Sequence, residues 1–232
     1  MAPVPFDQRT DKTAGAVLPC TLETTMQTAH NLSYRHFQMP AIIAKTNPSD
    51  LSDLECDART LALEIHHDQL WGQYFYIEHL DRVHHTLASV GAARAHGFDA
   101  YLHDIYEDGP SEDLDKNRAH VRARFGDDTD AVIWAVSGFG ETRRTRQLCI
   151  VRGIADLPKP LIARAVNLKM ADRIVNMRLC AENMTGNITI ESRNVCMLDR
   201  YRKENELGYG ELFRMGDKDL YLQYLDLVNP NA

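Results

Sequence analysis

The sequence predicts an all-α protein, and three observations support this fold class. Apolar residues recur at three- and four-residue spacing along most of the chain beyond residue 50, Gly and Pro divide these stretches, and the alternation typical of strands is nearly absent. A length of 232 residues suits one domain of ordinary size. We therefore expect an N-terminal extension over residues 1–50, which lacks sustained periodicity, and one helical domain over residues 51–232.

Each expected helix begins or ends at a recognisable signal. A turn sequence at residues 47–50 precedes the first helix, and Gly91 ends the second. Gly109-Pro110 ends the third, a Ser-Glu-Asp-Leu sequence caps the fourth, and Pro160 lies in the first turn of the sixth. The helices are expected over residues 51–69, 77–91, 92–108, 111–126, 127–137, 160–182, 189–206 and 217–228.

Charge and composition exclude several classes of protein. The 33 acidic and 26 basic side chains give a formal net charge of −7, opposite to what binding of duplex nucleic acid requires, so we expect no nucleic-acid partner. The five cysteines are scattered and never form a C-x-x-C pair, which argues against a disulfide framework or a thiolate zinc site. No stretch resembles a secretory signal or approaches the roughly 18 apolar residues of a membrane span. We expect a cytoplasmic enzyme or binding protein without membrane contact, and leave its oligomeric state open.

A dense polar cluster lies within the third expected helix. His103-Asp104 is followed four residues later by Glu107-Asp108, so a helix would stack each residue of the first pair near its counterpart in the second. If buried, these carboxylates need a cation or hydrogen-bond donors to offset repulsion and desolvation. The alternative is a solvated acidic helix end, which the segment taken alone supports equally.

Two further residues extend this cluster into a candidate metal site. Asp172 lies in an otherwise apolar helical segment, which predicts a partly buried carboxylate with a partner. A set of two imidazoles and two carboxylates suits Mn²⁺, Fe²⁺, Zn²⁺ or another divalent first-row metal, with room for water. The alternative for Asp172 alone is a structural ion pair with Lys169 or with the arginine that follows it. The four candidate ligands are His79, His103, Asp104 and Asp172.

Five motifs, taken in chain order, resemble those of a known family. They are H-x-x-Q at residues 66–69, Y-I-x-H at 76–79, L-H-D-x-x-E-D at 102–108, F-G at 125–126 and K-M-A-D-R-x-x-N-M-R at 169–178. In this order they resemble the HD-domain hydrolases of RelA/SpoT-type proteins and of the small metazoan SpoT homologues. The resemblance covers residues 55–205 and implies an HD-domain helical bundle.

The resemblance also implies an activity and roles for named residues. The activity is removal of the 3′-pyrophosphate from a guanosine alarmone such as ppGpp, with Mn²⁺ as cofactor. The four candidate ligands would hold the metal, and Glu107 with Asp108 would be the catalytic pair that positions and deprotonates the attacking water. The residues that match substrate-contacting positions are Asn176, Lys169 and Tyr201.

The chain departs from the family around the expected base-binding segment. Leu70-Trp71-Gly72 stands where the family carries Arg or Lys, Phe75 replaces a proline, and Gly109 replaces a threonine. Trp71 offers a flat face for a base but also fits core packing. The preference for guanine or adenine is therefore open. A different nucleotide substrate such as NADPH or a 5′-nucleotide, and a catalytically weak nucleotide sensor or antitoxin-like protein, are the alternatives.

Two further groups of polar residues have competing interpretations. The basic run Arg143-Arg144-x-Arg146 is expected in a loop, where it either guides an anionic substrate or is simply solvated. The histidine pairs at residues 66–67 and 84–85 are each expected to place one ring in the core and one in solvent.

Overall fold

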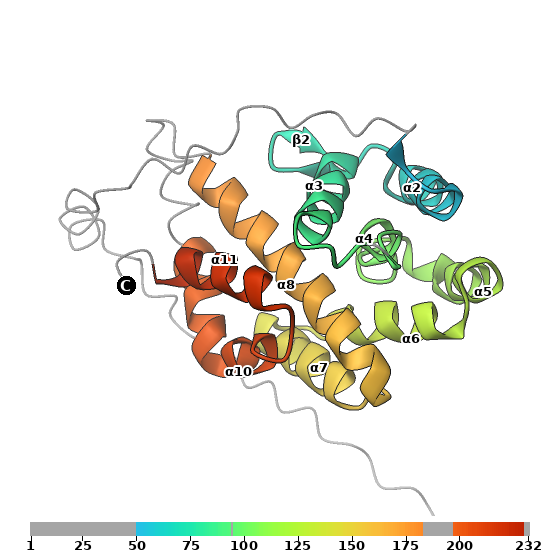
Figure 1. The fold of residues 1–232 in the computed structure, drawn as a ribbon. Helices are drawn as coiled ribbons and strands as arrows, with labels where there is room; N and C mark the ends of the chain where they lie inside the picture. Colours follow the sequence, from blue (N-terminus) through green and yellow to red (C-terminus); the bar gives the residue numbers. More distant parts are fainter. Residues whose placement is uncertain (1–49, 94, 183–196, 230–232) are drawn as a thin grey trace, which may run out of the picture. The chain divides into compact units, whose positions relative to one another are not determined.

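The computed structural model describes residues 50–93, 95–182 and 197–229, and it confirms the all-α fold class (Figure 1). The expected N-terminal extension, apart from its last residue, lies outside the described residues. Within the described part of the chain, strands are limited to a two-stranded antiparallel hairpin, β1 Leu70–Trp71 and β2 Tyr74–Phe75. All of the described residues belong to one compact unit.

Most of the helices agree with the sequence prediction. They are α2 Asp53–His66, α3 Tyr76–Ser89, α5 Leu114–Phe125, α6 Asp127–Val136, α8 Lys159–Glu182 and α11 Lys218–Val228. Shorter helical turns are η2 Ser111–Asp113, η3 Asn205–Tyr209 and α10 Gly210–Phe213. Residues 197–204 are also helical, whereas residues 189–196 of that expected helix lie outside the described ranges.

Helix α8 is the element around which the other helices pack. It contacts α3, α6, α7 (Arg143–Ala155), α10 and α11, and Figure 1 shows it passing between α3 and α11. Because neighbours cover it on most sides, consecutive residues along it are buried, as for Met170, Ala171 and Asp172. The core is therefore built around a helix that carries a predicted metal ligand in its buried middle.

The prediction of one helix over residues 92–108 is wrong. Among the described residues of this segment, helical structure is limited to α4, Asp99–Leu102, and turns follow it. Gly97 provides a physical reason, because glycine disfavours a helix interior, and an added Cβ at this position would lie 2.0 Å from the carboxylate end of the Glu55 side chain. The described residues before α4 form turns, and the polar cluster of residues 103–108 follows on turns rather than on a helix.

The basic run Arg143-Arg144-x-Arg146 lies in a helix rather than in the expected loop. It forms the first turn of α7, which begins after the N-cap residue Thr142. Thr142 Oγ1 accepts the Thr145 N–H at 3.1 Å, and the Thr145 hydroxyl accepts the Thr142 N–H at the same distance. Thr-x-x-Thr is a weaker sequence signal than the usual pairing with Glu or Gln, which is why sequence reasoning misses it.

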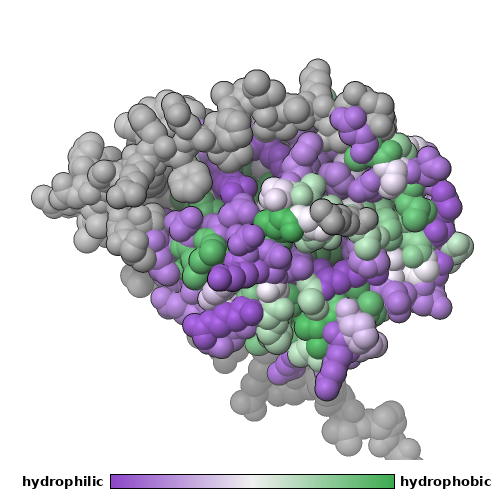
Figure 2. All heavy atoms as spheres, viewed as in Figure 1, coloured by the Kyte–Doolittle hydropathy of each residue, from purple (hydrophilic) through white to green (hydrophobic). Residues whose placement is uncertain are grey.

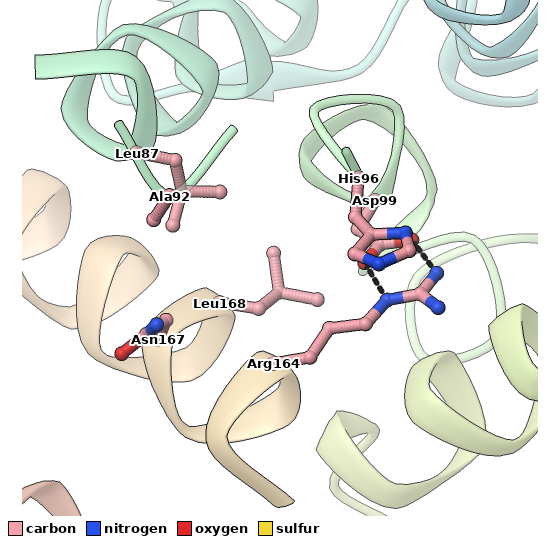
Figure 3. A pocket seen from close by; sticks show the side chains of 7 residues that line it. All are labelled: Leu87, Ala92, His96, Asp99, Arg164, Asn167 and Leu168. Carbon is pink, nitrogen blue, oxygen red and sulfur yellow. Dashed lines mark hydrogen bonds and ion pairs between the residues drawn. The ribbon is translucent and has the colours of Figure 1, made fainter. Parts of the chain in front are cut away.

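A small cavity lies beside α8, facing α4 and the end of α3 (Figure 3). A buried ion pair borders it, because Arg164 of α8 donates to both carboxylate oxygens of Asp99 at 2.6 and 2.7 Å. Asp99 is only 2% exposed, so the guanidinium replaces the hydration that this carboxylate loses on folding. The other lining residues are Leu87, Ala92, His96, Asn167 and Leu168.

The outer surface is mixed in polarity. On the face shown in Figure 2, apolar side chains form small patches between polar ones. Leu70 and Phe75, which pair across the hairpin, are each 60% exposed, and isolated exposure of this kind is ordinary in folded proteins. Within the described ranges, no helix combines the length and the apolar character needed to span a membrane.

We predict that Arg164→Met lowers the free energy of unfolding by about 3–5 kcal/mol, because it leaves the buried Asp99 carboxylate without its partner. The double variant Asp99→Leu/Arg164→Met removes both charges and should recover most of that loss. Urea unfolding followed by circular dichroism measures both effects. A cost below about 1 kcal/mol, the value typical of a surface pair, would contradict the assignment of a buried pair.

Candidate metal centre

Four side chains from three separate segments converge inside the domain. His79 lies in the first turn of α3, His103 and Asp104 directly follow α4, and Asp172 lies in the middle of α8. All four are buried, with exposed fractions between 1% and 7%. The structure thus brings together the four residues that the sequence predicts as metal ligands.

The potential ligand atoms lie close to the spacing that a shared cation requires. Asp104 Oδ2 is 2.9 Å from His103 Nε2 and 3.5 Å from His79 Nε2. Asp172 Oδ1 approaches the same two nitrogens at 3.7 and 3.4 Å, and the nitrogens are 3.4 Å apart. Donors about 2.1 Å from one first-row cation, at angles of about 90–110°, lie about 3.0–3.5 Å apart. The carboxylate-to-imidazole distances are close to this range, and the ligand atoms of His79, His103 and Asp104 form a group that could hold such a cation, with Asp172 Oδ1 approaching the two imidazoles of that group.

A hydrogen bond prepares His103 to offer one ring nitrogen to the centre. Its Nδ1 lies 2.9 Å from the Ala100 carbonyl oxygen, so we assign the proton of the neutral ring to Nδ1, which leaves the Nε2 lone pair for the centre. Without a cation, burial disfavours the imidazolium, but the carboxylates of Asp104 and Asp172 outweigh burial and raise the pKa of His103 to about 10. The raised pKa favours a proton on Nε2 when no cation is bound.

Aromatic packing holds the second imidazole. The His79 ring centroid lies 4.9 Å from that of Trp71 and 5.5 Å from that of Tyr76. Among the described residues, the buried Nδ1 of His79 has no hydrogen-bond partner. Trp71 is 8% exposed, which confirms the interpretation that it packs in the core. A buried indole does not present an open face to a nucleotide base.

Residues of the same helix hold both carboxylate oxygens of Asp172. Lys169 Nζ lies 2.9 Å from Oδ2, which confirms the ion pair with Lys169, whereas Arg173 pairs with Glu204 instead. Asn176 Nδ2 donates to Oδ1 at 2.5 Å. Burial opposes the charge, but Lys169 and the imidazoles outweigh burial and hold the pKa of Asp172 well below its usual value. The ion pair does not compete with a metal, because Oδ1 is the oxygen that faces the imidazoles.

The predicted catalytic pair lies beside these ligands. Tyr76 Oη is 2.7 Å from both Asp104 Oδ2 and Asp108 Oδ2, and since a phenol carries one proton it donates to one of them at a time. Glu107 Oε2 accepts the Gly138 N–H at 2.8 Å. Burial of the carboxyl groups raises the pKa of both Glu107 and Asp108, and the Asp104 carboxylate adds to both shifts. Carboxylates with a raised pKa are suited to accepting a proton near neutral pH.

The residues predicted to contact substrate have partners within the protein. Lys169 and Asn176 hold the Asp172 carboxylate. Tyr201 is 8% exposed, and guanidinium groups from α7 and α8 lie 5.0 and 4.4 Å from its ring centroid. Contact of these three residues with a nucleotide therefore stays a prediction.

Sequence reasoning does not predict the contacts that three residues make at the centre. Tyr76 bridges two carboxylates, Gly138 binds Glu107, and the Trp71 indole N–H donates to Asn176 Oδ1 at 2.9 Å. Tyr76 belongs to the quoted Y-I-x-H motif, which is a signal that it matters but not a signal of what it contacts. Gly138 and Trp71 leave no local pattern, because their partners lie far away in the chain.

The remaining histidine pairs agree with the sequence prediction. His66 and His84 are buried, with 4% and 9% exposure, whereas His67 and His85 are exposed. His66 stacks on Tyr76 with ring centroids 4.5 Å apart. It therefore supports the residue that bridges the two carboxylates.

Comparison with known proteins does not assign the chain to a family. The chain matches none of the family models and none of the curated proteins against which it was compared. Fold and site together define an all-α domain with a buried group of two histidines and two aspartates, in which the ligand atoms of His79, His103 and Asp104 all lie within 4.8 Å of one another. The family resemblance rests on its motifs alone.

We predict that binding of Mn²⁺ near neutral pH releases about one proton per site. Without the cation His103 carries a second proton, because its pKa is about 10, and an imidazole must lose that proton to coordinate a metal. The apparent affinity should therefore rise about tenfold per pH unit from about pH 7 to 9 and level off near the His103 pKa.

Calorimetric titration in buffers of different ionisation enthalpy measures the proton release. The control is His85→Ala, which removes an exposed imidazole and should leave the release unchanged. An affinity that does not vary over this pH range would contradict a ligating His103 whose pKa is raised in the metal-free protein.

Proposed function

We propose that the protein is a metal-dependent phosphohydrolase that acts on a pyrophosphorylated nucleotide. The observation that carries the proposal is the approach of both buried carboxylates to both imidazole nitrogens, at 2.9–3.7 Å, beside the Glu107-Asp108 pair. The motif resemblance supports the same activity and names the substrate class. That class is a guanosine or adenosine alarmone such as ppGpp, which would lose its 3′-pyrophosphate, with Mn²⁺ as the cation.

The four candidate ligands would hold the cation. When bound, Mn²⁺ or another divalent first-row cation polarises a phosphoryl oxygen and lowers the pKa of water. The protein's own part is to keep the ligands in place. The Ala100 carbonyl orients His103, and Lys169 with Asn176 holds Asp172.

Glu107 and Asp108 would take the proton of the attacking water. The Gly138 N–H occupies Oε2 of Glu107, which leaves Oε1 to accept that proton. Asp108 shares the Tyr76 hydroxyl with Asp104, so a proton gained by Asp108 redirects the hydroxyl toward the metal ligand. The raised pKa of both carboxyl groups makes them better bases near neutral pH.

Positive side chains at the centre support an anionic substrate in this acidic protein. Lys169 lies inside the centre, and Arg146 approaches Glu107 Oε1 to 3.9 Å with half of its side chain exposed. That separation is too long for a hydrogen bond, so a phosphate would be the better partner for this guanidinium. Its position favours a role for Arg146 in guiding an anionic substrate, whereas Arg143 of the same run pairs with Glu204.

We expect the purified protein to release pyrophosphate from ppGpp in the presence of Mn²⁺, and Asp104→Ala to abolish this release. The substitution removes the carboxylate nearest to His103, which also lies 3.5 Å from His79 Nε2, so the cation loses one of its ligands. Product analysis by ion chromatography measures the activity, and circular dichroism should show nearly unchanged helical content. Retained activity in Asp104→Ala would overturn the ligand assignment.

The same assay, run with ppGpp, pppApp, NADPH and simple nucleotides, separates the substrate alternatives. These alternatives are tested because Trp71 is buried, which removes one candidate surface for stacking a guanine or adenine base. Release of orthophosphate from NADPH or a 5′-nucleotide would identify that nucleotide, and not an alarmone, as the substrate. Tight ppGpp binding without turnover would instead identify a nucleotide sensor.

Glu107→Gln should lower kcat by about 10²–10⁴-fold, because the amide keeps the shape of the side chain but cannot take a proton. The affinity for Mn²⁺ should change little, since Glu107 is not among the four ligands. Steady-state kinetics and a Mn²⁺ titration test the two statements, with Glu112→Gln on the surface as the matched control. An unchanged kcat would exclude Glu107 as the proton acceptor.

A further inference from the structure

A chain of two hydrogen bonds links the hairpin to a metal ligand on α8. The Trp71 indole N–H donates to Asn176 Oδ1 at 2.9 Å. An indole nitrogen is a donor only, so this contact fixes which end of the Asn176 amide faces Trp71. The amide nitrogen is thereby turned toward Asp172.

The Asn176 amide is occupied by these contacts. Its Nδ2 lies 2.5 Å from Asp172 Oδ1 and 3.1 Å from the Asp172 backbone oxygen, one helical turn earlier. The two N–H groups and the oxygen of the amide therefore all have partners within the protein. An amide held in this way is suited to orienting Asp172.

Trp71 is itself held from two sides. Its ring lies 4.9 Å from the His79 ring and 5.3 Å from the guanidinium carbon of Arg82. Arg82 in turn donates to Glu182 Oε2 at 2.8 Å. Trp71 thus touches one imidazole of the centre directly and reaches the Asp172 carboxylate through Asn176.

We propose that Trp71 is a positioning residue for the metal centre, acting through Asn176 on Asp172 and by packing on His79. This inference rests on the proposed function only in requiring that the four ligands bind a cation. It assigns Asn176 to the orientation of a ligand rather than to substrate. It also gives a role to the residue that stands where the resembling family carries Arg or Lys.

The test is the affinity of the full-length protein for Mn²⁺, measured from the electron paramagnetic resonance signal of the free ion. Trp71→Phe keeps an aromatic ring but removes the N–H, and we expect a fall in affinity of about tenfold, the lower end of the range for partners of metal ligands. The matched control is Trp134→Phe. This second tryptophan is 39% exposed and lies against Arg118, and its substitution should leave the affinity unchanged.

A double-variant cycle separates positioning from general packing. Asn176→Ala should also weaken Mn²⁺ binding about tenfold, and Trp71→Phe should cause no further loss of affinity in the Asn176→Ala background. A tryptophan that only packs would lower stability without this coupling. Urea unfolding in the presence of a chelator gives the stability of each variant. If Trp71→Phe does not fold, the Mn²⁺ affinity of Asn176→Ala alone decides whether the link to Asp172 positions the centre.

The outcomes distinguish this inference from the proposed function. Wild-type protein that binds neither Mn²⁺ nor Zn²⁺ overturns the metal centre and the inference together. If the wild-type protein binds Mn²⁺ and folded Trp71→Phe or Asn176→Ala binds it with the same affinity, the inference is overturned, whereas the metal centre is not. If the two substitutions lower the Mn²⁺ affinity additively, the proposal that Trp71 acts through Asn176 is overturned.

Discussion

The burial of charge where α3, α8 and the segment after α4 meet is the constraint on which the rest of the structure depends. Asp104 and Asp172 are 7% and 6% exposed, and carboxylates at that depth are costly unless other groups offset their charge. Imidazoles face one oxygen of each, while a phenol, an ammonium and an amide hold them from other sides. The helices are placed so that these partners meet, which explains why α8 is packed on most sides.

Local signals predict most of the helices, because capping and apolar spacing act within one or two turns. The capping box of Ser52 and Glu55 begins α2, and prolines mark the start of α8. Such signals fail where a distant contact fixes the path of the chain. The segment around Gly97 is one case, since its position beside the Glu55 side chain depends on how α2 packs and not on its own neighbours.

The candidate ligands could be predicted because each lies in a motif, whereas the residues that hold them could not. The bond from Tyr76 to Asp104 spans 28 positions, and the bond from Trp71 to Asn176 spans 105. Contacts over such separations leave no period in a single sequence. Asn176 and Asp172 are four residues apart on one helix, so their proximity was predictable. The direction of the Asn176 amide was not, because it depends on Trp71.

Anchoring both oxygens of Asp172 would limit which ions the proposed metal centre accepts. A carboxylate held by Lys169 on one atom and by Asn176 on the other cannot easily rotate to chelate an ion with both. Calcium, a larger ion that collects about six to eight oxygen ligands, commonly takes a carboxylate in that chelating mode. In the proposed metal centre, the rigid setting of Asp172 on α8 would therefore disfavour Ca²⁺ and favour smaller ions that accept imidazole nitrogen and a single carboxylate oxygen.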